Sequence, residues 1–187
     1  DAVLLVLMID FAALALLPRV FFRREGKLNL HWWLTALPYI FSAASLLLSF
    51  FGRLAPWSGY GTPLTRVLGL VAVPLGMAAF GLITFTLGTH RRRIALWHQT
   101  NDAPVEIVTT GAYGRIRHPF YTSFLLMLLG AFLYSPQGLS LGALIYGFAI
   151  MNHTAAGEER RLLASEFGPE YEAYMRRTGR FIPRKTA

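Results

Sequence analysis

The chain has 187 residues, of which 54% are hydrophobic and 15% charged, and its formal net charge is +8. Its mean hydropathy of +0.43 is too high for a soluble domain of this size, so the composition indicates a membrane protein. Cysteine is absent, which excludes disulfides and thiolate metal sites.

Three stretches without charged residues divide the chain, between Lys27 and Arg53, between Arg66 and Arg91, and between Arg117 and Glu158. A helix needs about 20 apolar residues to cross the hydrocarbon core. The first two stretches each accommodate one helix, and the third accommodates two because a Ser-Pro-Gln-Gly turn at 135–138 interrupts it. The apolar segment that opens the chain has no basic region before it, which predicts a first span rather than a cleaved signal. The five predicted spans cover about Ala2–Phe22, His31–Phe51, Leu64–Thr89, a segment starting at Pro119, and Leu139–Ala156. The fifth helix is expected to continue into the cytosol through Phe167, where Gly168 ends it and Pro169 opens a short amphipathic helix.

Basic residues gather on one side of these predicted spans. They follow the first span, occupy the connection between the third and fourth, and follow the fifth, whereas only Arg53 and Arg66 flank the loop between the second and third. The positive-inside rule makes the basic side cytoplasmic, with the N-terminus outside and the C-terminus inside. Such residues serve as topology signals and contact anionic membrane lipids, and their distribution argues against nucleic-acid binding.

The expected fold is therefore all-α, a multi-pass protein of the cell membrane with five transmembrane helices. We expect a single membrane domain over residues 1–187. Residues 1–89 form its three N-terminal spans, and residues 90–187 hold a cytoplasmic loop, a helical hairpin and a C-terminal helix. The loop and the C-terminal helix are expected to form a site that faces the cytoplasm.

The densest polar motif is Gly-Ala-Tyr-Gly-Arg-Ile-Arg-His-Pro-Phe-Tyr at 111–121. Pro119 suits the first position of a helix, and the free N–H groups of a helix start favour a carboxylate or phosphate. Arg117 can hold such an anion, His118 can donate or accept a hydrogen bond, and Tyr121 can stack on a ligand. The alternative is an interfacial belt of snorkelling arginines and boundary tyrosines. The density of the motif favours a ligand site.

A pair of acidic residues, Glu158 and Glu159, follows the fifth predicted span. One of the two is expected simply to pair with a nearby arginine. The other is equally compatible with a cationic or ribose-bearing ligand, since both favour a carboxylate.

Together these motifs resemble those of the integral membrane methyltransferases, namely the isoprenylcysteine carboxyl methyltransferases and the related phospholipid N-methyltransferases. The resemblance covers residues 105–183, whereas the first three spans match only in hydropathy. It departs from the family at Ser123, where glycine is usual, and around His153, where a basic residue often precedes the glutamates. The matching residues are Gly111-x-Tyr113, Arg-His-Pro-x-Tyr at 117–121, Glu-Glu-x-x-Leu at 158–162, Phe167-Gly168, Tyr171 and Tyr174.

The resemblance implies an enzyme that binds S-adenosylmethionine and transfers its methyl group by in-line displacement. The acceptor would be a lipophilic molecule or lipid that enters from the bilayer, with an isoprenylcysteine-type carboxylate preferred over a lipid amine or thiol. Arg117, Arg180 and Glu159 would be catalytic, with the arginines holding a carboxylate acceptor. The implied cofactor-binding residues are Gly111, Tyr113, Arg117, His118, Pro119, Tyr121, Glu158, Glu159, Tyr171 and Tyr174.

Two other functions fit the same residues less well. The sterol reductases bind a nicotinamide dinucleotide at a similar place, but Phe120 and Ser123 depart from that family's pattern. A non-enzymatic adaptor would use the basic face to bind anionic lipid. The histidines are not spaced as metal ligands, so no metal site is expected, and nothing in the sequence indicates an obligate protein partner.

Overall fold

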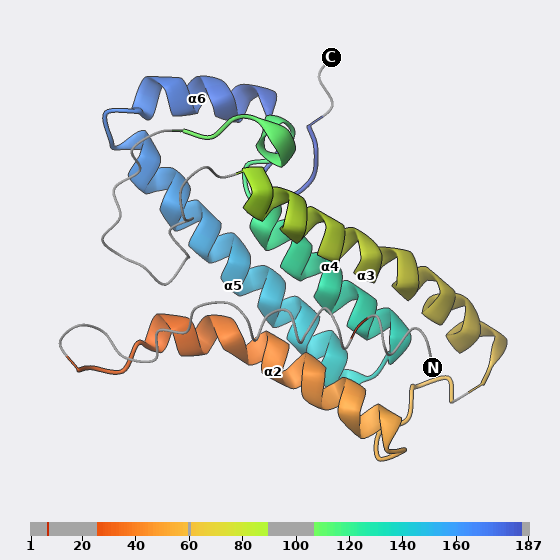
Figure 1. Ribbon diagram of the computed structural model, residues 1–187. Coiled ribbons are helices and arrows are strands. Elements are labelled where there is room, and N and C mark those ends of the chain that lie inside the picture. Colours follow the sequence, from red (N-terminus) through yellow and green to blue (C-terminus); the bar gives the residue numbers. More distant parts are fainter. Residues whose placement is uncertain (1–6, 8–25, 60, 90–106, 185–187) are drawn as a thin grey trace.

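The structure is a computed structural model that describes residue 7 and residues 26–59, 61–89 and 107–184. Within these ranges the chain forms five α-helices and one 3-10 turn (Figure 1). Apart from Leu7, the first predicted span, Ala2–Phe22, lies outside the described residues, as does most of the connection after residue 89. The elements, with the labels of Figure 1, are α2 (Leu30–Phe50), α3 (Pro63–Thr89), η1 (Gly111–Gly114), α4 (Pro119–Tyr134), α5 (Gly138–Leu163) and α6 (Gly168–Arg177).

Three of these helices, α2, α3 and α5, are long and apolar enough to cross a membrane. The second and third predicted spans agree with α2 and α3 to within a residue at each end. The fourth span begins at Pro119, as predicted, but α4 has only 16 residues, a length of about 24 Å at 1.5 Å per residue. The prediction of an all-helical membrane protein is therefore confirmed.

The hairpin of α4 and α5 turns at a tightly bonded corner. Gln137 is the N-cap of α5 and forms a capping box with Ser140, in which each side chain satisfies a backbone N–H group of the other. The Ser140 hydroxyl also donates to the Ser135 carbonyl at 2.6 Å. This corner supports the prediction that the Ser-Pro-Gln-Gly sequence separates two antiparallel helices.

The end of α5 was expected near Phe167, but the helix ends at Leu163. Its last carbonyls are satisfied locally, since the Ser165 hydroxyl donates to the Leu162 carbonyl at 2.7 Å. Gly168 was expected to end α5 and instead opens α6. A Cβ atom at Gly168 would lie 2.5 Å from the Leu163 carbonyl oxygen, so the corner between the helices requires glycine.

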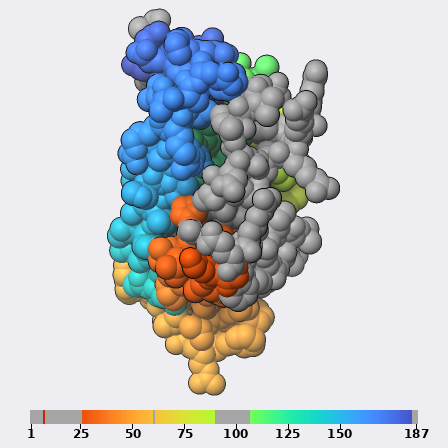
Figure 2. All heavy atoms as spheres, turned by 90° about the vertical axis from the view of Figure 1, so that its left-hand side faces the viewer, coloured from red at the N-terminus to blue at the C-terminus, as the bar shows by residue number. Residues whose placement is uncertain are grey.

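The helices pack in two neighbouring pairs, α3 against α4 and α2 against α5, with the α4–α5 hairpin joining them. Phe124 is fully buried at the centre, with Tyr39 and Phe120 in edge contact at ring distances of 5.1 and 4.8 Å. By contrast, Leu70 and Met77 of α3 are 71% and 64% exposed. Large apolar side chains on the outside are what a lipid-facing helix requires. Figure 2 shows α6 at one end of α5 and α2 toward the other end.

Close packing in the hairpin depends on Gly147 of α5. A Cβ atom there would lie 2.3 Å from Leu128 Cδ1 and 3.3 Å from Pro38 Cβ, whereas one at Gly142 of the same helix would meet nothing within 4 Å. We expect Gly147→Ala to be less stable than Gly142→Ala by about 1–3 kcal/mol, the usual cost of overpacking. Thermal unfolding in detergent measures the difference. Because both changes add the same methyl group to one helix, equal stabilities would contradict this packing.

Candidate functional site

The start of α4 is bonded to the segment that follows α6. Ile116 and Gly179 form an isolated parallel bridge. The Arg117 N–H donates to the Gly179 carbonyl at 2.8 Å, and the His118 N–H donates to the Arg180 carbonyl at 3.1 Å. These bonds bring together two segments about 60 residues apart in sequence, and they place Arg117, His118 and Arg180 side by side.

Glu159 of α5 is the acceptor at the centre of these side chains. Together with Arg117, His118 and Arg180 it forms what is called below the Glu159 group. Its carboxylate accepts from Arg117 Nε at 2.9 Å and from Arg180 Nε at 3.2 Å, and a further bond comes from the second nitrogen of the Arg180 fork. His118 Nε2 lies 3.3 Å from the same carboxylate. Glu159 is only 3% exposed, and a carboxylate so far from water requires this number of partners.

Glu158 occupies a more open position beside this group. Its carboxylate accepts a hydrogen bond from the Tyr121 hydroxyl at 2.5 Å and lies 3.5 Å from His118 Nδ1. The His118 ring stacks on Tyr121 at 5.4 Å with only 5° between their planes. The Glu158 side chain is 25% exposed, against 4% for Glu159. The two glutamates thus differ, one held by arginines and the other by a phenol at the edge of the group.

The two arginines are themselves held from the side opposite Glu159. Arg117 Nη1 donates to the carbonyls of Met175 and Thr178, at 3.3 and 2.5 Å, at the C-terminal end of α6. Arg180 Nη1 donates to Asn152 Oδ1 at 2.7 Å, and the hydrogen bonds that Arg180 donates to Glu159 raise the pKa of Arg180. Both guanidinium groups are therefore fixed in orientation.

Sequence reasoning missed Asn152 and the two carbonyls of α6. Asn152 lies seven residues before Glu159, two helical turns away on α5, in a stretch without charged residues. That spacing was a usable signal, because polar side chains inside a span mark positions that face protein rather than lipid. The Met175 and Thr178 carbonyls gave no signal, since backbone acceptors carry no residue identity.

Four further residues of the predicted site form a second group next to the Glu159 group. They are Gly111, Tyr113, Tyr171 and Tyr174. Tyr174 of α6 donates its hydroxyl to the Tyr113 carbonyl at 2.6 Å, and its ring lies 5.8 Å from that of Tyr171. Burial raises the pKa of Tyr174 to about 12, so the phenol stays protonated as a donor. Gly111 has a positive φ of 58°, and a Cβ atom there would lie 2.6 Å from the Thr89 hydroxyl. This group fixes the 3-10 turn against α3 and α6.

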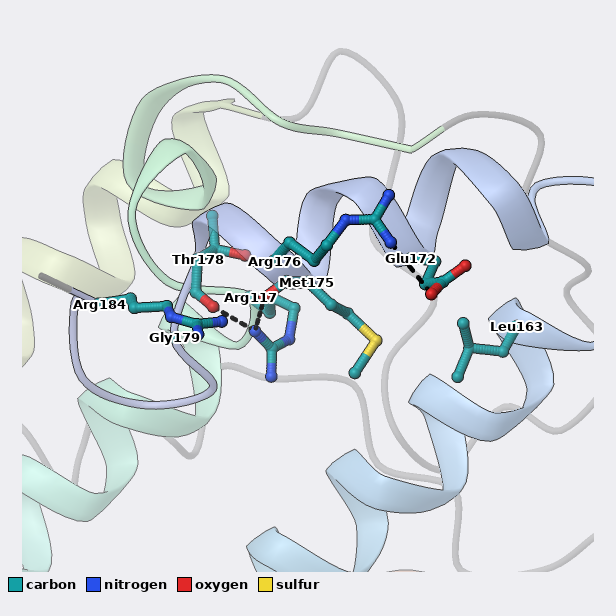
Figure 3. Close-up of a pocket in the computed structure, with 8 residues that line it drawn as sticks. All are labelled: Arg117, Leu163, Glu172, Met175, Arg176, Thr178, Gly179 and Arg184. Carbon is teal, nitrogen blue, oxygen red and sulfur yellow. Dashed lines mark hydrogen bonds and ion pairs between the residues drawn. The ribbon is translucent and has the colours of Figure 1, made fainter. Parts of the chain in front are cut away.

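A pocket opens on the far side of Arg117, with a volume of about 510 Å³, within the range of small-molecule sites (Figure 3). Arginine side chains dominate its polar lining. The single acidic side chain, Glu172, already pairs with Arg176 at 3.0 Å. The lining residues are Arg117, Leu163, Glu172, Met175, Arg176, Thr178, Gly179 and Arg184.

The part of the chain that the structure describes contains no preformed metal-binding site. No group of three or more histidine, aspartate or glutamate side chains there is arranged to hold a metal ion. The closest approach to one, His118 with the two glutamates, also contains two guanidinium groups.

Two curated proteins are similar to this chain. The first is the cobalt-zinc-cadmium resistance protein CzcN of Cupriavidus metallidurans, 35% identical over 145 residues, which cover 77% of this chain and 59% of the relative. The second is the nickel-cobalt-cadmium resistance protein NccN of Alcaligenes xylosoxydans xylosoxydans, 29% identical over 113 residues, 60% of this chain and 52% of the relative. The chain thus spans between half and three-fifths of the length of these relatives. No family model and no solved structure matches it.

These relatives overturn the function expected from the motifs. Both are named for resistance to metal ions, so the predicted methyltransferase activity is wrong as a statement of function, and so is the reductase alternative. The motif residues do lie together in space, but their proximity does not identify a reaction. An enzymatic activity and S-adenosylmethionine as the cofactor stay predictions that neither relative's name addresses.

The burial of Glu159 predicts a large effect of neutralising it. Glu159→Gln leaves Arg117 and Arg180 without their shared counter-charge, and breaking a buried ion pair from one side costs about 3–5 kcal/mol. Because Arg180 is partly exposed to water, we expect a loss at or below the lower end of this range. Thermal unfolding in detergent measures it.

The matched control is Glu172→Gln, which breaks the exposed pair with Arg176. Exposed pairs contribute about 0–1 kcal/mol, so this variant should unfold close to the parent temperature. If the two variants lost the same stability, the central role of Glu159 would be contradicted.

Proposed function

We propose that this protein is a multi-pass membrane protein that contributes to bacterial resistance against divalent metal ions such as cobalt, zinc and cadmium. The observation that carries the proposal is the 35% identity over 145 residues with a protein named for resistance to these three metals. A second relative named for nickel, cobalt and cadmium supports the same class of function.

The site through which it acts is the Glu159 group together with the adjoining pocket. Glu159 already accepts from two arginines and approaches His118, so its carboxylate offers little to a cation. In the pocket lining, Arg176 is paired with Glu172 and Arg117 with Glu159, and Arg184 adds a further positive charge, which favours an anionic ligand over a bare divalent cation. The protein therefore supports resistance by binding an anionic or organic ligand at this end of the hairpin.

The proposed membrane arrangement has five spans, with the Glu159 group and α6 in the cytoplasm. The arginines of α6 and the segment after it support this orientation, because basic residues concentrate on the cytoplasmic side. The loop between α2 and α3 then lies outside the cell.

Reporter fusions test this orientation. Alkaline phosphatase is active only outside the cytoplasm, so a fusion within the loop at 52–59 should be active and a fusion after Arg184 inactive. Green fluorescent protein fused at the same two places should give the opposite pattern. Activity of the phosphatase after Arg184 would place the Glu159 group on the outer side and contradict the arrangement.

Growth in the presence of metal salts tests the function itself. Expressed in a metal-sensitive bacterial strain, the protein should raise the inhibitory concentration of cobalt, zinc or cadmium at least twofold over the empty vector. Arg180→Ala should remove this gain because it takes away half of the charge that holds Glu159.

Arg160→Ala serves as the matched control, since it removes an exposed arginine of α5, next to Glu159 in sequence, that does not line the pocket. Immunoblots of membrane fractions establish that the variants accumulate to the same level. No gain in tolerance from parent protein present in the membrane would refute the proposed function. Equal loss in both variants would instead refute the role of the Glu159 group.

A further inference from the structure

The pocket beside Arg117 lies just beyond the apolar part of α5. That helix carries no charged residue from Gly138 to Gly157, a stretch of about 20 residues that spans about 30 Å, the thickness of the hydrocarbon core. Leu163 ends the helix about 9 Å farther along, at the depth of the lipid headgroups. Helix α6 lies across this end of α5 (Figure 1), and the pocket is lined by Leu163 from α5 and by Met175 from α6. The pocket therefore opens at the level where lipid phosphates lie.

One positive charge in the lining of this pocket has no counter-charge. Arg117 pairs with Glu159, and Arg176 pairs with Glu172. Arg184 makes no ion pair with any residue that the structure describes. The lining thus complements a ligand that carries a single negative charge. A phosphate diester carries one such charge at neutral pH, whereas a phosphate monoester carries about 1.5–2.

Arg117 offers the pocket two further hydrogen-bond donors. A guanidinium group has five N–H groups, one on Nε and two on each terminal nitrogen. Nε donates to Glu159 and Nη1 donates to two carbonyls at the end of α6, which uses three of the five. The two on Nη2 have no acceptor within the described ranges, although the side chain is only 9% exposed. Nη2 is not one of the unpartnered atoms that are sealed inside the protein, so it remains open to a ligand.

The other end of the pocket is apolar. Figure 3 shows Arg117 and Arg184 toward one end and Leu163 toward the other, with the Met175 side chain between them. Leu163 is 40% exposed, a large apolar surface for a residue beyond the hydrocarbon core. A small hydrated anion gains nothing from such a surface, whereas the glycerol and first acyl carbons of a phospholipid are stabilised by covering it. The lining therefore suits an amphiphilic anion.

We propose that this pocket binds the phosphate diester of an anionic phospholipid from the cytoplasmic leaflet. The phosphate accepts hydrogen bonds from Arg184 and from Nη2 of Arg117, and the glycerol end of the lipid contacts Leu163 and Met175. Arginine suits this role because its planar fork donates two hydrogen bonds to one phosphate group. Basic pockets beside transmembrane helices on the cytoplasmic side recognise anionic headgroups in the same way. A headgroup with its own ammonium, such as that of phosphatidylcholine, brings a second positive charge next to Arg184 and is disfavoured.

This inference rests on the proposed function, because it names the ligand class of the pocket through which the protein is proposed to act. Lipid binding is measured without metal ions, however, so the two proposals can fail separately. A preference for anionic lipid at this pocket would stand even if the growth assay showed no gain in tolerance. A gain in tolerance without any lipid preference would overturn the lipid assignment alone.

Native mass spectrometry of the full chain in a non-ionic detergent tests the binding. The protein is mixed with equal concentrations of phosphatidylglycerol and phosphatidylcholine that have the same acyl chains, and the bound lipids are counted. We expect the parent to retain about fivefold more phosphatidylglycerol, and Arg184→Gln to lose this preference, since one basic group near an anionic headgroup accounts for about this factor. Arg160→Gln is the matched control, because it removes the same charge from an arginine at the end of α5 that does not line the pocket. Both arginines are exposed, so neither change should disturb the fold.

Equal retention of the two lipids by the parent would overturn the proposal. Equal loss of the preference in both variants would also overturn it, because binding would then follow surface charge and not the pocket. Thermal unfolding in detergent separates a lipid from free phosphate. Water-soluble dihexanoyl phosphatidylglycerol should raise the unfolding temperature of the parent, whereas dihexanoyl phosphatidylcholine and inorganic phosphate should not. An equal rise with inorganic phosphate would assign the pocket to the free anion and overturn the lipid.

Discussion

The hydrogen bonds between the Glu159 carboxylate and the guanidinium groups of Arg117 and Arg180 join three parts of the chain that are remote in sequence. Glu159 belongs to α5, Arg117 precedes α4, and Arg180 follows α6. Removing a carboxylate from water costs several kcal/mol, so the group is stable only when all three parts are in place. The parallel bridge at Ile116 and Gly179 supplies the backbone order that this requires. The position of α6 follows, because its final carbonyls also bind Arg117.

The two ends of the hairpin solve the problem of buried polarity in different ways. At the Glu159 end, formal charges compensate each other and the phenol of Tyr121 bonds to Glu158. At the corner end, neutral groups suffice, since Gln137 and four serines bond among themselves and to the backbone. Between them lies an apolar centre around Phe124. This division suits a membrane, in which charges are tolerated near one interface and are costly at the middle.

Much of the helical layout could be predicted from local signals. The gaps between charged residues located α2 and α3, and Pro119 located the start of α4, because a proline favours the first helical position. The end of α5 was misplaced by four residues, since the corner depends on the contact between Gly168 and the Leu163 carbonyl, which no local pattern reveals. Likewise, the motif residues were found as a set, but the contacts of Arg117 with Met175 and Thr178 depend on backbone atoms. The function expected from those motifs was wrong because shared site residues do not specify what a protein does for the cell.

The tight loop after α6 has a consequence for how the molecule is made. A Cβ atom at Gly179 would lie 1.7 Å from the Ile182 carbonyl oxygen, so the chain folds back on itself immediately beside Arg180. During synthesis α5 emerges before this loop, so Glu159 is made before Arg180, the second of its two arginine partners. The hydrogen bonds between Arg180 and Glu159 therefore form late in biogenesis. Until the loop has folded, the nascent hairpin is held mainly by its apolar faces and its neutral corner.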